Sequence, residues 1–213
     1  IDRLNICFYF FCMCPGGVDV AAATEEGRLV SPGMSYHARD FANANSALVV
    51  TVSPEDFEGD SPLAGMEFQR HYENLAFKLG GGNYKAPIQL VGDFMKDRPS
   101  TKLGKVIPSY TRGYVFRELK NCLPSYVIEA LKEGIQNFDN KIKGYGSEDA
   151  VLTGIETRTS APVRIHRDNN LQSINVGGLY PAGEGAGFAG GIISAAVDGI
   201  RVAEQIIGKY SLP

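Results

Sequence analysis

The sequence has no tryptophan, only three histidines and only four cysteines among its 213 residues. So few histidines and cysteines leave little material for a metal centre or for a scaffold built on disulfides. Lys and Arg together number 21 against 24 Asp and Glu, and the net charge is −3. That balance provides no basic surface for the phosphate backbone of a nucleic acid. The sequence therefore argues against nucleic-acid binding and against the disulfide-rich secreted class.

Long hydrophobic runs are also absent, because the longest run, residues 6–14, falls far short of the ~20 residues of a membrane-spanning helix. It is rich in aromatic residues and is followed by Pro15-Gly16-Gly17, which predicts a buried strand that stops at a turn. A secretory signal peptide is the alternative, with Ala21-Ala22-Ala23 as the small-residue site, but Arg3 is the only basic residue before the run. We expect a cytoplasmic protein without a membrane span.

The cysteines are Cys7, Cys12, Cys14 and Cys122. Cys12 and Cys14 should project to the same face of a strand, because side chains alternate along it. Their spacing matches no familiar zinc pairing, so no metal site is predicted. Free thiols in a reducing cytoplasm are one interpretation. The alternative is one thiol, with Cys14 as the candidate, exposed to a redox cofactor.

Hydrophobic periodicity predicts a strand-rich beginning and end around a helical middle. The run 47–52 is β-branched and uninterrupted, so we expect it to be buried on both faces. Further strands are predicted at 18–23 (pairing with 28–30), 150–156 and 163–165, and helices at 63–79, 87–95 and 124–142.

This order predicts a mixed α+β fold of the α/β class. The strand-rich outer segments, 1–52 and 150–213, should form a mixed sheet, with a largely helical insertion at 62–142. Residues 1–149 are expected to form a substrate-binding or cap-like region. Residues 150–213 are expected to form a C-terminal segment that closes on a strand, a glycine turn and a helix.

The glycine turn lies at residues 177–191, and its segment 185–190 matches G-x-G-x-x-G literally. A complete dinucleotide fingerprint needs a second strand that ends in an acidic residue about twenty positions later. The predicted helix runs to Ile207 and the sequence ends at Pro213, which leaves no room for that strand. The match is therefore not the first βαβ unit of a dinucleotide domain. A tight connection without a ligand is the alternative interpretation.

The helix after the turn should present a narrow face of small and apolar residues to a sheet: Ile192, Ala196, Gly199, Ala203 and Ile207. Asp198 is expected to lie away from that face. The helix N-terminus carries about half a positive charge, which favours a phosphate or a ring that gains electrons. Glu184 is the only ionisable group of the turn, and its carboxylate suits hydrogen bonds from sugar hydroxyls.

Residues 179–184, Leu-Tyr-Pro-Ala-Gly-Glu, followed by the glycines and the helix, resemble the second flavin motif of flavoproteins with two dinucleotide-binding domains. The resemblance extends to segments 11–17, 43–47, 80–87 and 156–160, which are similar to the uncharacterised FAD-dependent dehydrogenases of bacteria.

The resemblance implies an FAD-dependent oxidoreductase, with NAD(P)H as a possible electron donor. It implies that Glu184 binds the ribityl chain and that the helix N-terminus approaches the pyrophosphate or the flavin. The cofactor-binding residues would be Gly183, Glu184, Gly185, Gly187, Gly190, Gly191 and Ile192. Such proteins also carry an N-terminal Rossmann region for the ADP half of FAD, for which residues 1–176 offer no fingerprint. We therefore expect a C-terminal portion, inactive alone and partnered by the missing Rossmann region of the same protein.

No acid–base constellation stands out, and in flavoenzymes the cofactor carries the hydride chemistry. Arg158 and Cys14 are the candidates for a catalytic role. Arg158 would bind an anionic substrate or stabilise the reduced flavin, although an arginine in a polar loop is also an ordinary surface residue. The alternative function is a non-catalytic module that binds a nucleotide or another anion with the same glycine turn.

Overall fold

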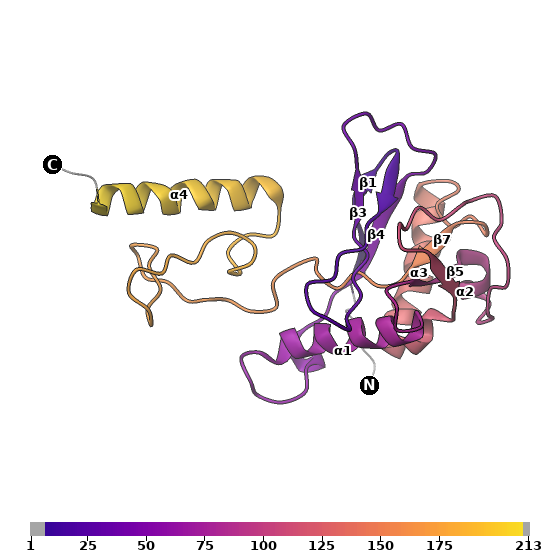
Figure 1. Ribbon diagram of the computed structural model, residues 1–213, viewed down its shortest axis with the longest axis horizontal. Coiled ribbons are helices and arrows are strands. Elements are labelled where there is room, and N and C mark those ends of the chain that lie inside the picture. Colours follow the sequence, from indigo (N-terminus) through magenta and orange to yellow (C-terminus); the bar gives the residue numbers. More distant parts are fainter. Residues whose placement is uncertain (1–6, 211–213) are drawn as a thin grey trace. The chain divides into compact units, whose positions relative to one another are not determined.

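The computed structural model describes residues 7–210, and its contacts divide the chain into two compact units. The larger unit comprises Ile1–Asp56 and Gln69–Thr157, and the smaller one comprises Phe57–Phe68 and Arg158–Pro213. The boundary between them falls inside helix α1 (Ala64–Leu79). The larger unit holds all the named strands, and the smaller unit holds helix α4 (Ile192–Tyr210) (Figure 1).

Two antiparallel pairs of strands occupy the N-terminal part of the larger unit. Strand β1 (Phe8–Cys14) pairs with β4 (Asn45–Val50), and β2 (Gly17–Asp19) pairs with β3 (Gly33–Ser35). Backbone hydrogen bonds extend the second pair, because Val20 N–H donates to Pro32 O and Ala22 N–H donates to Val30 O. After β2, the chain therefore stays extended and lies beside residues 30–32, which lead into β3.

A three-stranded mixed sheet forms the second half of the larger unit, with β5 (Ala86–Leu90) in the centre. Strand β6 (Tyr114–Phe116) is parallel to β5, and β7 (Val151–Thr153) is antiparallel to it. The remaining elements are η1 (Pro54–Asp56), α2 (Val91–Met95), η2 (Leu119–Asn121) and α3 (Ser125–Lys141).

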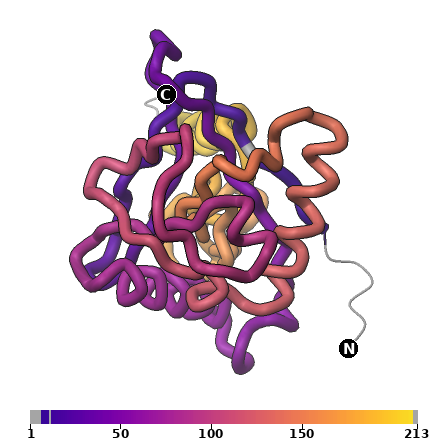
Figure 2. The backbone as a smooth tube through the Cα atoms, turned by 90° about the vertical axis from the view of Figure 1, so that its right-hand side faces the viewer, coloured from indigo at the N-terminus to yellow at the C-terminus, as the bar shows by residue number. Residues whose placement is uncertain are grey.

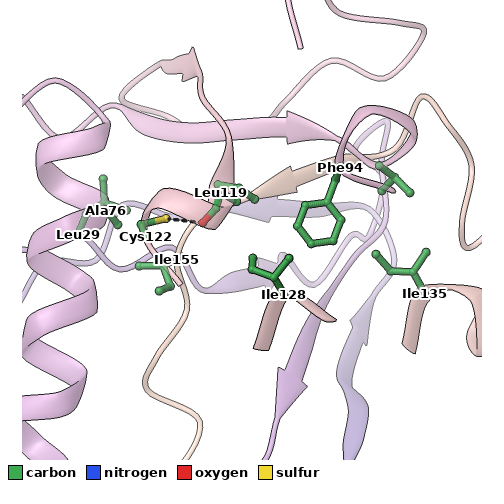
Figure 3. Close-up of a cluster of buried hydrophobic side chains, with 9 residues drawn as sticks. Leu29, Ala76, Phe94, Leu119, Cys122, Ile128, Ile135 and Ile155 are labelled. Carbon is green, nitrogen blue, oxygen red and sulfur yellow. Dashed lines mark hydrogen bonds between the residues drawn. The ribbon is translucent and has the colours of Figure 1, made fainter. Parts of the chain in front are cut away.

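The core of the larger unit lies between α1, α3 and this sheet (Figure 3). Ala76 of α1 and Ile128 and Ile135 of α3 are buried there beside Phe94 of α2. Cys122 is fully buried in the same cluster, and burial raises the pKa of its thiol to about 12. Cys122 is therefore a core residue and not a reactive thiol.

Segments distant in sequence meet in the larger unit (Figure 2). The N–H of Ser31 donates to Ile155 O at 2.8 Å, and the N–H of Val91 donates to Ala150 O at 2.8 Å. Residues near the end of this unit's sequence are thus bonded both to its N-terminal part and to its middle. Long-range contacts therefore hold the unit together.

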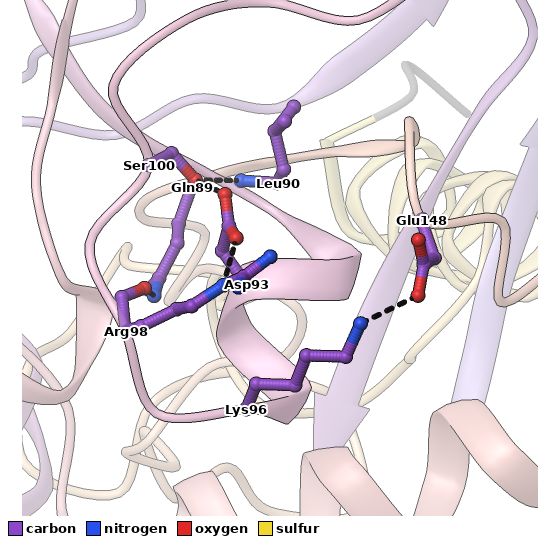
Figure 4. Close-up of polar contacts among 7 residues, drawn as sticks. All are labelled: Gln89, Leu90, Asp93, Lys96, Arg98, Ser100 and Glu148. Carbon is purple, nitrogen blue, oxygen red and sulfur yellow. Dashed lines mark hydrogen bonds and ion pairs between the residues drawn. The ribbon is translucent and has the colours of Figure 1, made fainter.

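A polar network fixes the loop after α2 (Figure 4). Asp93 accepts hydrogen bonds from the Ser100 hydroxyl at 2.7 Å and from Arg98 Nε at 2.6 Å. Buried Gln89 donates to Arg98 O and accepts from Leu119 N–H, each at 2.9 Å. The Ser100 and Arg98 side chains both hold the pKa of Asp93 below its usual value. These bonds tie the loop 96–100 to the end of β5 and to α2.

The mixed α+β class predicted from the sequence is confirmed, but the strands form three small sheets instead of one. The run 47–52, most of which lies in β4, was expected to be buried on both faces. This expectation is wrong: only Val49 of the run is buried, because within residues 7–210 β4 pairs with β1 alone.

The predicted helix 87–95 is half wrong, because residues 86–90 form the central strand β5 and only Val91–Met95 is helical. Pro87 is accommodated in a central strand because the pairing with β7 begins one residue later, at Ile88 and Thr153. The missing N–H of Pro87 would point to the β7 side, on which its carbonyl accepts the N–H of Gly154 at 2.9 Å. Only the reciprocal bond, from residue 87 to Gly154 O, is missing at this end of the ladder.

Cys12 and Cys14 do not share a regular strand face as predicted, because an irregularity between Phe11 and Cys14 shifts the register with β4. Cys12 has φ of 47° and is exposed, whereas Cys14 is half-buried. The predicted strand 163–165 is also not formed; the backbone there makes a single hydrogen bond from Ile165 N–H to Ala186 O.

The C-terminal end of α1 and the N-terminal end of α3 agree with the sequence prediction. Helix α1 ends at Leu79, before three glycines, and α3 begins directly after Pro124. Gly80 N–H donates to Ala76 O at 2.9 Å, and a Cβ on Gly80 would lie 2.0 Å from Lys85 O. Gly80 is therefore required by a close approach of two backbone segments.

Replacing Gly80 by alanine is expected to destabilise the larger unit by about 1–3 kcal/mol, because the opposing atom is a backbone oxygen that cannot rotate away. The free energy of unfolding in urea measures this effect. Lys78→Ala, an exposed change in the last turn of the same helix, is the control and should stay within about 0.5 kcal/mol. Equal stability of Gly80→Ala and the parent protein would contradict the structure here.

Candidate functional site

The glycine turn leads into α4 without the preceding strand that the sequence predicted. Between Ser173 and Gly191 the chain forms turns, with hydrogen bonds from Leu179 N–H to Val176 O and from Ser173 N–H to Leu179 O. The strand does not form because the smaller unit has no named strand, among its described residues, that could pair with this segment.

Two glycines of the turn are required by its own backbone. Gly183 has φ of 70° and Gly187 has φ of 80°, values that residues with a side chain rarely adopt. Phe188 N–H donates to Gly183 O at 3.0 Å, and Gly187 N–H donates to Glu184 O at 2.8 Å. A Cβ on Gly187 would also lie 2.5 Å from Val163 O. These bonds define a closed turn over residues 183–188.

An ion pair fastens this turn to the helix. Arg167 Nη2 lies 2.6 Å from Asp198 Oδ1, and Arg167 Nη1 lies 3.0 Å from Asp198 Oδ2. The side chains are only 11% and 10% exposed. Asp198 Oδ2 also accepts the N–H of Gly183 at 2.8 Å, and Arg167 donates to Pro181 O at 2.8 Å. One buried pair therefore connects the loop at 167, the start of the turn and the second turn of α4.

Aromatic contacts complete this arrangement. The guanidinium carbon of Arg167 lies 3.7 Å from the centroid of the Phe188 ring, and that of Arg164 lies 5.1 Å from it. Arg164 Nε donates to Gly187 O at 2.9 Å. The far side of the turn is thus held by two arginines, of which Arg167 also carries the ion pair.

Asp198 is strongly acidic in this setting. The hydrogen bonds from Arg167 lower the pKa of Asp198 to about 2; burial opposes this shift, and the Gly183 N–H supports it. The carboxylate therefore stays charged throughout the physiological range, which favours the ion pair with Arg167.

Arg167, Asp198 and Phe188 were not predicted from the sequence as site residues. Asp198 was expected to lie away from the packed face of the helix, and this is wrong, because Asp198 and Val202 are the buried residues of α4. One signal was available: Asp198 is the only carboxylate between Ile192 and Ala203, in a stretch rich in alanine, glycine and isoleucine. A lone acid in such a helix needs a buried partner.

The face predicted to pack on a sheet is largely exposed. Ile192 is 86% exposed and Ile207 64%, and Ala196 and Ala203 are exposed as well. Ile193, Ile200 and Ile207 lie opposite the Asp198 side of α4 and form, with Val197, an apolar surface on this helix.

The N-terminus of α4 presents backbone donors. The N–H groups of Ile192 and Ile193 have no acceptor within residues 7–210, as is usual in the first turn of a helix. Ser194 Oγ accepts the N–H of Gly191 at 3.2 Å, which closes the helix start in the manner of a capping box. The dipole of this 19-residue helix favours negative charge at that end.

Other glycines of the turn have no structural role of their own. A Cβ on Gly185 or on Gly190 would meet no atom within 4 Å, and neither residue has a positive φ. Glu184 is half-buried, and its carboxylate has no hydrogen-bond or ion-pair partner in the described part of the chain. Open backbone, free N–H groups and an unpaired carboxylate thus lie within ten residues, 184–193.

The two candidates for catalysis lie apart in the sequence and in different units. Arg158 is exposed in the smaller unit, which also holds the turn. Cys14 ends β1 in the larger unit, where burial raises the pKa of its thiol, Cys12 raises it further and Arg39 lowers it. A raised pKa leaves less thiolate at neutral pH, which weakens the case for Cys14 as a redox partner.

Within residues 7–210, no group of three His, Cys, Asp or Glu side chains is arranged to hold a metal ion. Over the same range, no helix has the length and apolar character that crossing a bilayer demands.

Comparisons with known proteins give the family. Residues 3–159 match the family described as "FAD-dependent protein, C-terminal domain-like". The chain belongs to this family. The matched region covers most of the chain and ends before the glycine turn, so membership rests on the larger unit and not on the turn.

A relative from Clostridium beijerinckii is 80% identical over 212 residues. It is described only as "Uncharacterized protein". The alignment covers 100% of this chain but 40% of the relative. The chain thus spans less than half the length of the curated relative that it matches.

The Asp198–Arg167 pair gives a pH prediction. Because the folded pKa of Asp198 is below its usual value, the pair stabilises the smaller unit above about pH 4, and this stability is lost as the pH falls toward 2. In Asp198→Asn, the free energy of unfolding of this unit should be about 3 kcal/mol lower at pH 7. It should also change less as the pH falls into the acid range. Denaturant titrations between pH 7 and pH 2 measure both effects.

Glu204→Gln is the matched control for this prediction, because Glu204 is an exposed carboxylate on the same helix. Its stability should follow that of the parent protein at every pH. An Asp198→Asn variant with unchanged stability and an unchanged acid transition would contradict the role given to the pair.

Proposed function

We propose that the full-length protein is an FAD-dependent oxidoreductase and that this chain supplies part of its flavin site. The observation that carries the proposal is the presence of Gly185 and Gly190 at positions where the chain itself has no need of glycine. Glycines of this kind allow a ligand to approach the backbone closely. They lie in a chain of an FAD-dependent family, beside the N-terminus of a long helix.

In this proposal, the turn 183–192 holds the cofactor. The free N–H groups of Ile192 and Ile193 donate to the pyrophosphate or to the electron-rich edge of the flavin. The unpaired carboxylate of Glu184 accepts hydrogen bonds from ribityl hydroxyls. When bound, the flavin supplies the hydride chemistry, with NADH or NADPH as the proposed donor.

Arg167 and Asp198 act on the turn and not on the cofactor. Their bonds to Pro181 O and Gly183 N–H hold the first residues of the turn in one conformation before a ligand arrives. A site that is already formed loses less conformational entropy on binding. Arg158 remains a candidate for binding an anionic substrate, since it is exposed in the same unit.

Gly185→Val tests the cofactor site. Because a side chain at Gly185 meets no atom of the chain, the fold should be unchanged, whereas the affinity of the full-length protein for FAD should fall tenfold or more. Gly208→Val is the control: Gly208 is equally open but lies near the other end of α4. Flavin content after purification, titration of added FAD and thermal unfolding give the three readouts.

Equal flavin content in Gly185→Val and the control would contradict the proposed site. The reaction class is tested separately, by anaerobic titration of the full-length protein with NADH and with NADPH. Bleaching of the flavin absorption supports an oxidoreductase. Nucleotide binding without any reducible chromophore would indicate the alternative, a non-catalytic binding module.

We further propose that the apolar surface of α4 packs against the part of the full-length polypeptide outside residues 1–213. Most of the C. beijerinckii relative lies outside the aligned region, so this occupant has the required length. Three of the surface isoleucines, at 193, 200 and 207, recur at helical spacing on one side of α4 and are at least 60% exposed. In this proposal, the residues that complete the flavin site come from two parts of one polypeptide.

Ile200→Glu tests this contact. In the full-length protein the change would bury a charge, so the free energy of unfolding should fall by about 2 kcal/mol or more. Glu204→Gln on the same helix should leave it unchanged. A fully stable, monomeric Ile200→Glu protein would contradict the contact. A parent protein that is dimeric and an Ile200→Glu variant that is a stable monomer would instead assign the surface to a second copy.

A further inference from the structure

A cavity in the larger unit lies outside the glycine turn and is assigned no role by the flavin proposal. Its volume is about 330 Å³, within the range of small-molecule sites. It is lined by the extended segment after β2, by the buried Leu29 and Val30, and by three residues at the entrance to β5 and β6: Tyr84, Tyr110 and Arg112. All lining residues belong to the same unit.

The extended segment presents an unpaired backbone edge on this side. Val20 and Ala22 use their N–H groups to bond the chain at residues 30–32, so the N–H groups of the alternate residues point to the opposite edge. On that edge, Asp19 N–H donates to the Ser109 hydroxyl at 2.9 Å. The next two N–H groups, of Ala21 and Ala23, have no acceptor within the described residues.

The carbonyl groups of Ala21 and Ala23 share this edge, because the N–H and C=O of one residue in an extended chain point to the same side. The edge therefore offers donors and acceptors in alternation next to Tyr110 and Arg112, which follow Ser109 in the chain. A ligand on this edge needs both kinds of group.

Arg112 supplies a positive charge at the cavity. It is exposed, and its guanidinium carbon lies 5.9 Å from the centroid of the Tyr84 ring. In the described part of the chain it has neither a carboxylate partner nor a hydrogen-bond acceptor, so its N–H groups are available to a ligand. One guanidinium matches the charge of a monocarboxylate, whereas a phosphate dianion would need more positive charge.

The surroundings of Arg112 are rigid. The Tyr84 hydroxyl accepts the N–H of Gly27 at 3.2 Å, and the Tyr110 hydroxyl donates to Tyr84 O at 3.1 Å. Gly113 N–H donates to Tyr110 O, and Ala86 N–H donates to Gly113 O, which fixes the turn that carries Arg112 at the start of β6. The charge is therefore presented from a turn anchored on both sides.

We propose that this cavity binds a small organic acid that carries a hydrogen-bond donor next to its carboxylate, such as a 2-hydroxy acid with a short apolar body. The carboxylate pairs with Arg112 and a free N–H of the edge, the adjacent hydroxyl donates to a carbonyl of the edge, and the apolar body contacts Leu29 and Val30. The proposal does not depend on flavin binding.

The test uses the full-length protein and 2-hydroxy-4-methylpentanoate as the probe, with calorimetric titration as the readout. Two analogues serve as comparisons: 4-methylpentanoate lacks the hydroxyl group, and 4-methylpentane-1,2-diol lacks the carboxylate. The hydroxy acid should bind most tightly, 4-methylpentanoate several-fold more weakly, and the diol at least tenfold more weakly. Inorganic phosphate should bind more weakly than the hydroxy acid.

Arg112→Gln should weaken binding of the hydroxy acid tenfold or more, the loss of one charge-assisted hydrogen bond. Arg117→Gln, an exposed arginine beyond the same strand, is the matched control and should bind like the parent protein. Thermal unfolding confirms that both variants are folded. Three results would overturn the proposal. They are equal affinity of Arg112→Gln and the control for the hydroxy acid, no binding of the hydroxy acid at about 10 mM, and tighter binding of phosphate than of the hydroxy acid.

Discussion

The smaller unit depends on one buried ion pair. It has no named strand among its described residues, so neither a sheet nor a second long helix can hold the glycine turn against α4. Arg167 and Asp198 do this instead, because their four hydrogen bonds join three separate segments at one point. A buried pair requires its neighbours to satisfy the remaining donors and acceptors, and here those neighbours are backbone groups of the turn.

This arrangement divides the glycines into two kinds. Gly183 and Gly187 serve the turn itself, through positive φ values and the close approach of Val163 O. Gly185 and Gly190 serve nothing within the chain, and they lie beside free N–H groups at the start of α4. The larger unit is organised differently, around a buried core and a polar network at β5, and it carries the match to an FAD-dependent family.

Sequence periodicity predicted helices correctly where one face of the helix is buried. It predicted α1 and α3 and their ends at Leu79 and after Pro124. It failed at β5, because Pro87 before a short apolar run is typical of a helix start, and only the neighbouring strands decide that the run is extended. It also placed Asp198 on the wrong face, because α4 packs on polar loops and not on a sheet.

The sequence by itself determined the mixed α+β class, the helices α1 and α3 and the resemblance to FAD-dependent proteins, since these depend on local pattern. The tertiary structure alone decided which glycines the chain needs, which partner Asp198 has and that an open backbone edge lies beside Arg112. The reason is that each of these depends on contacts between residues far apart in sequence: Arg167 with Asp198, Val163 with Gly187, and Asp19 with Ser109.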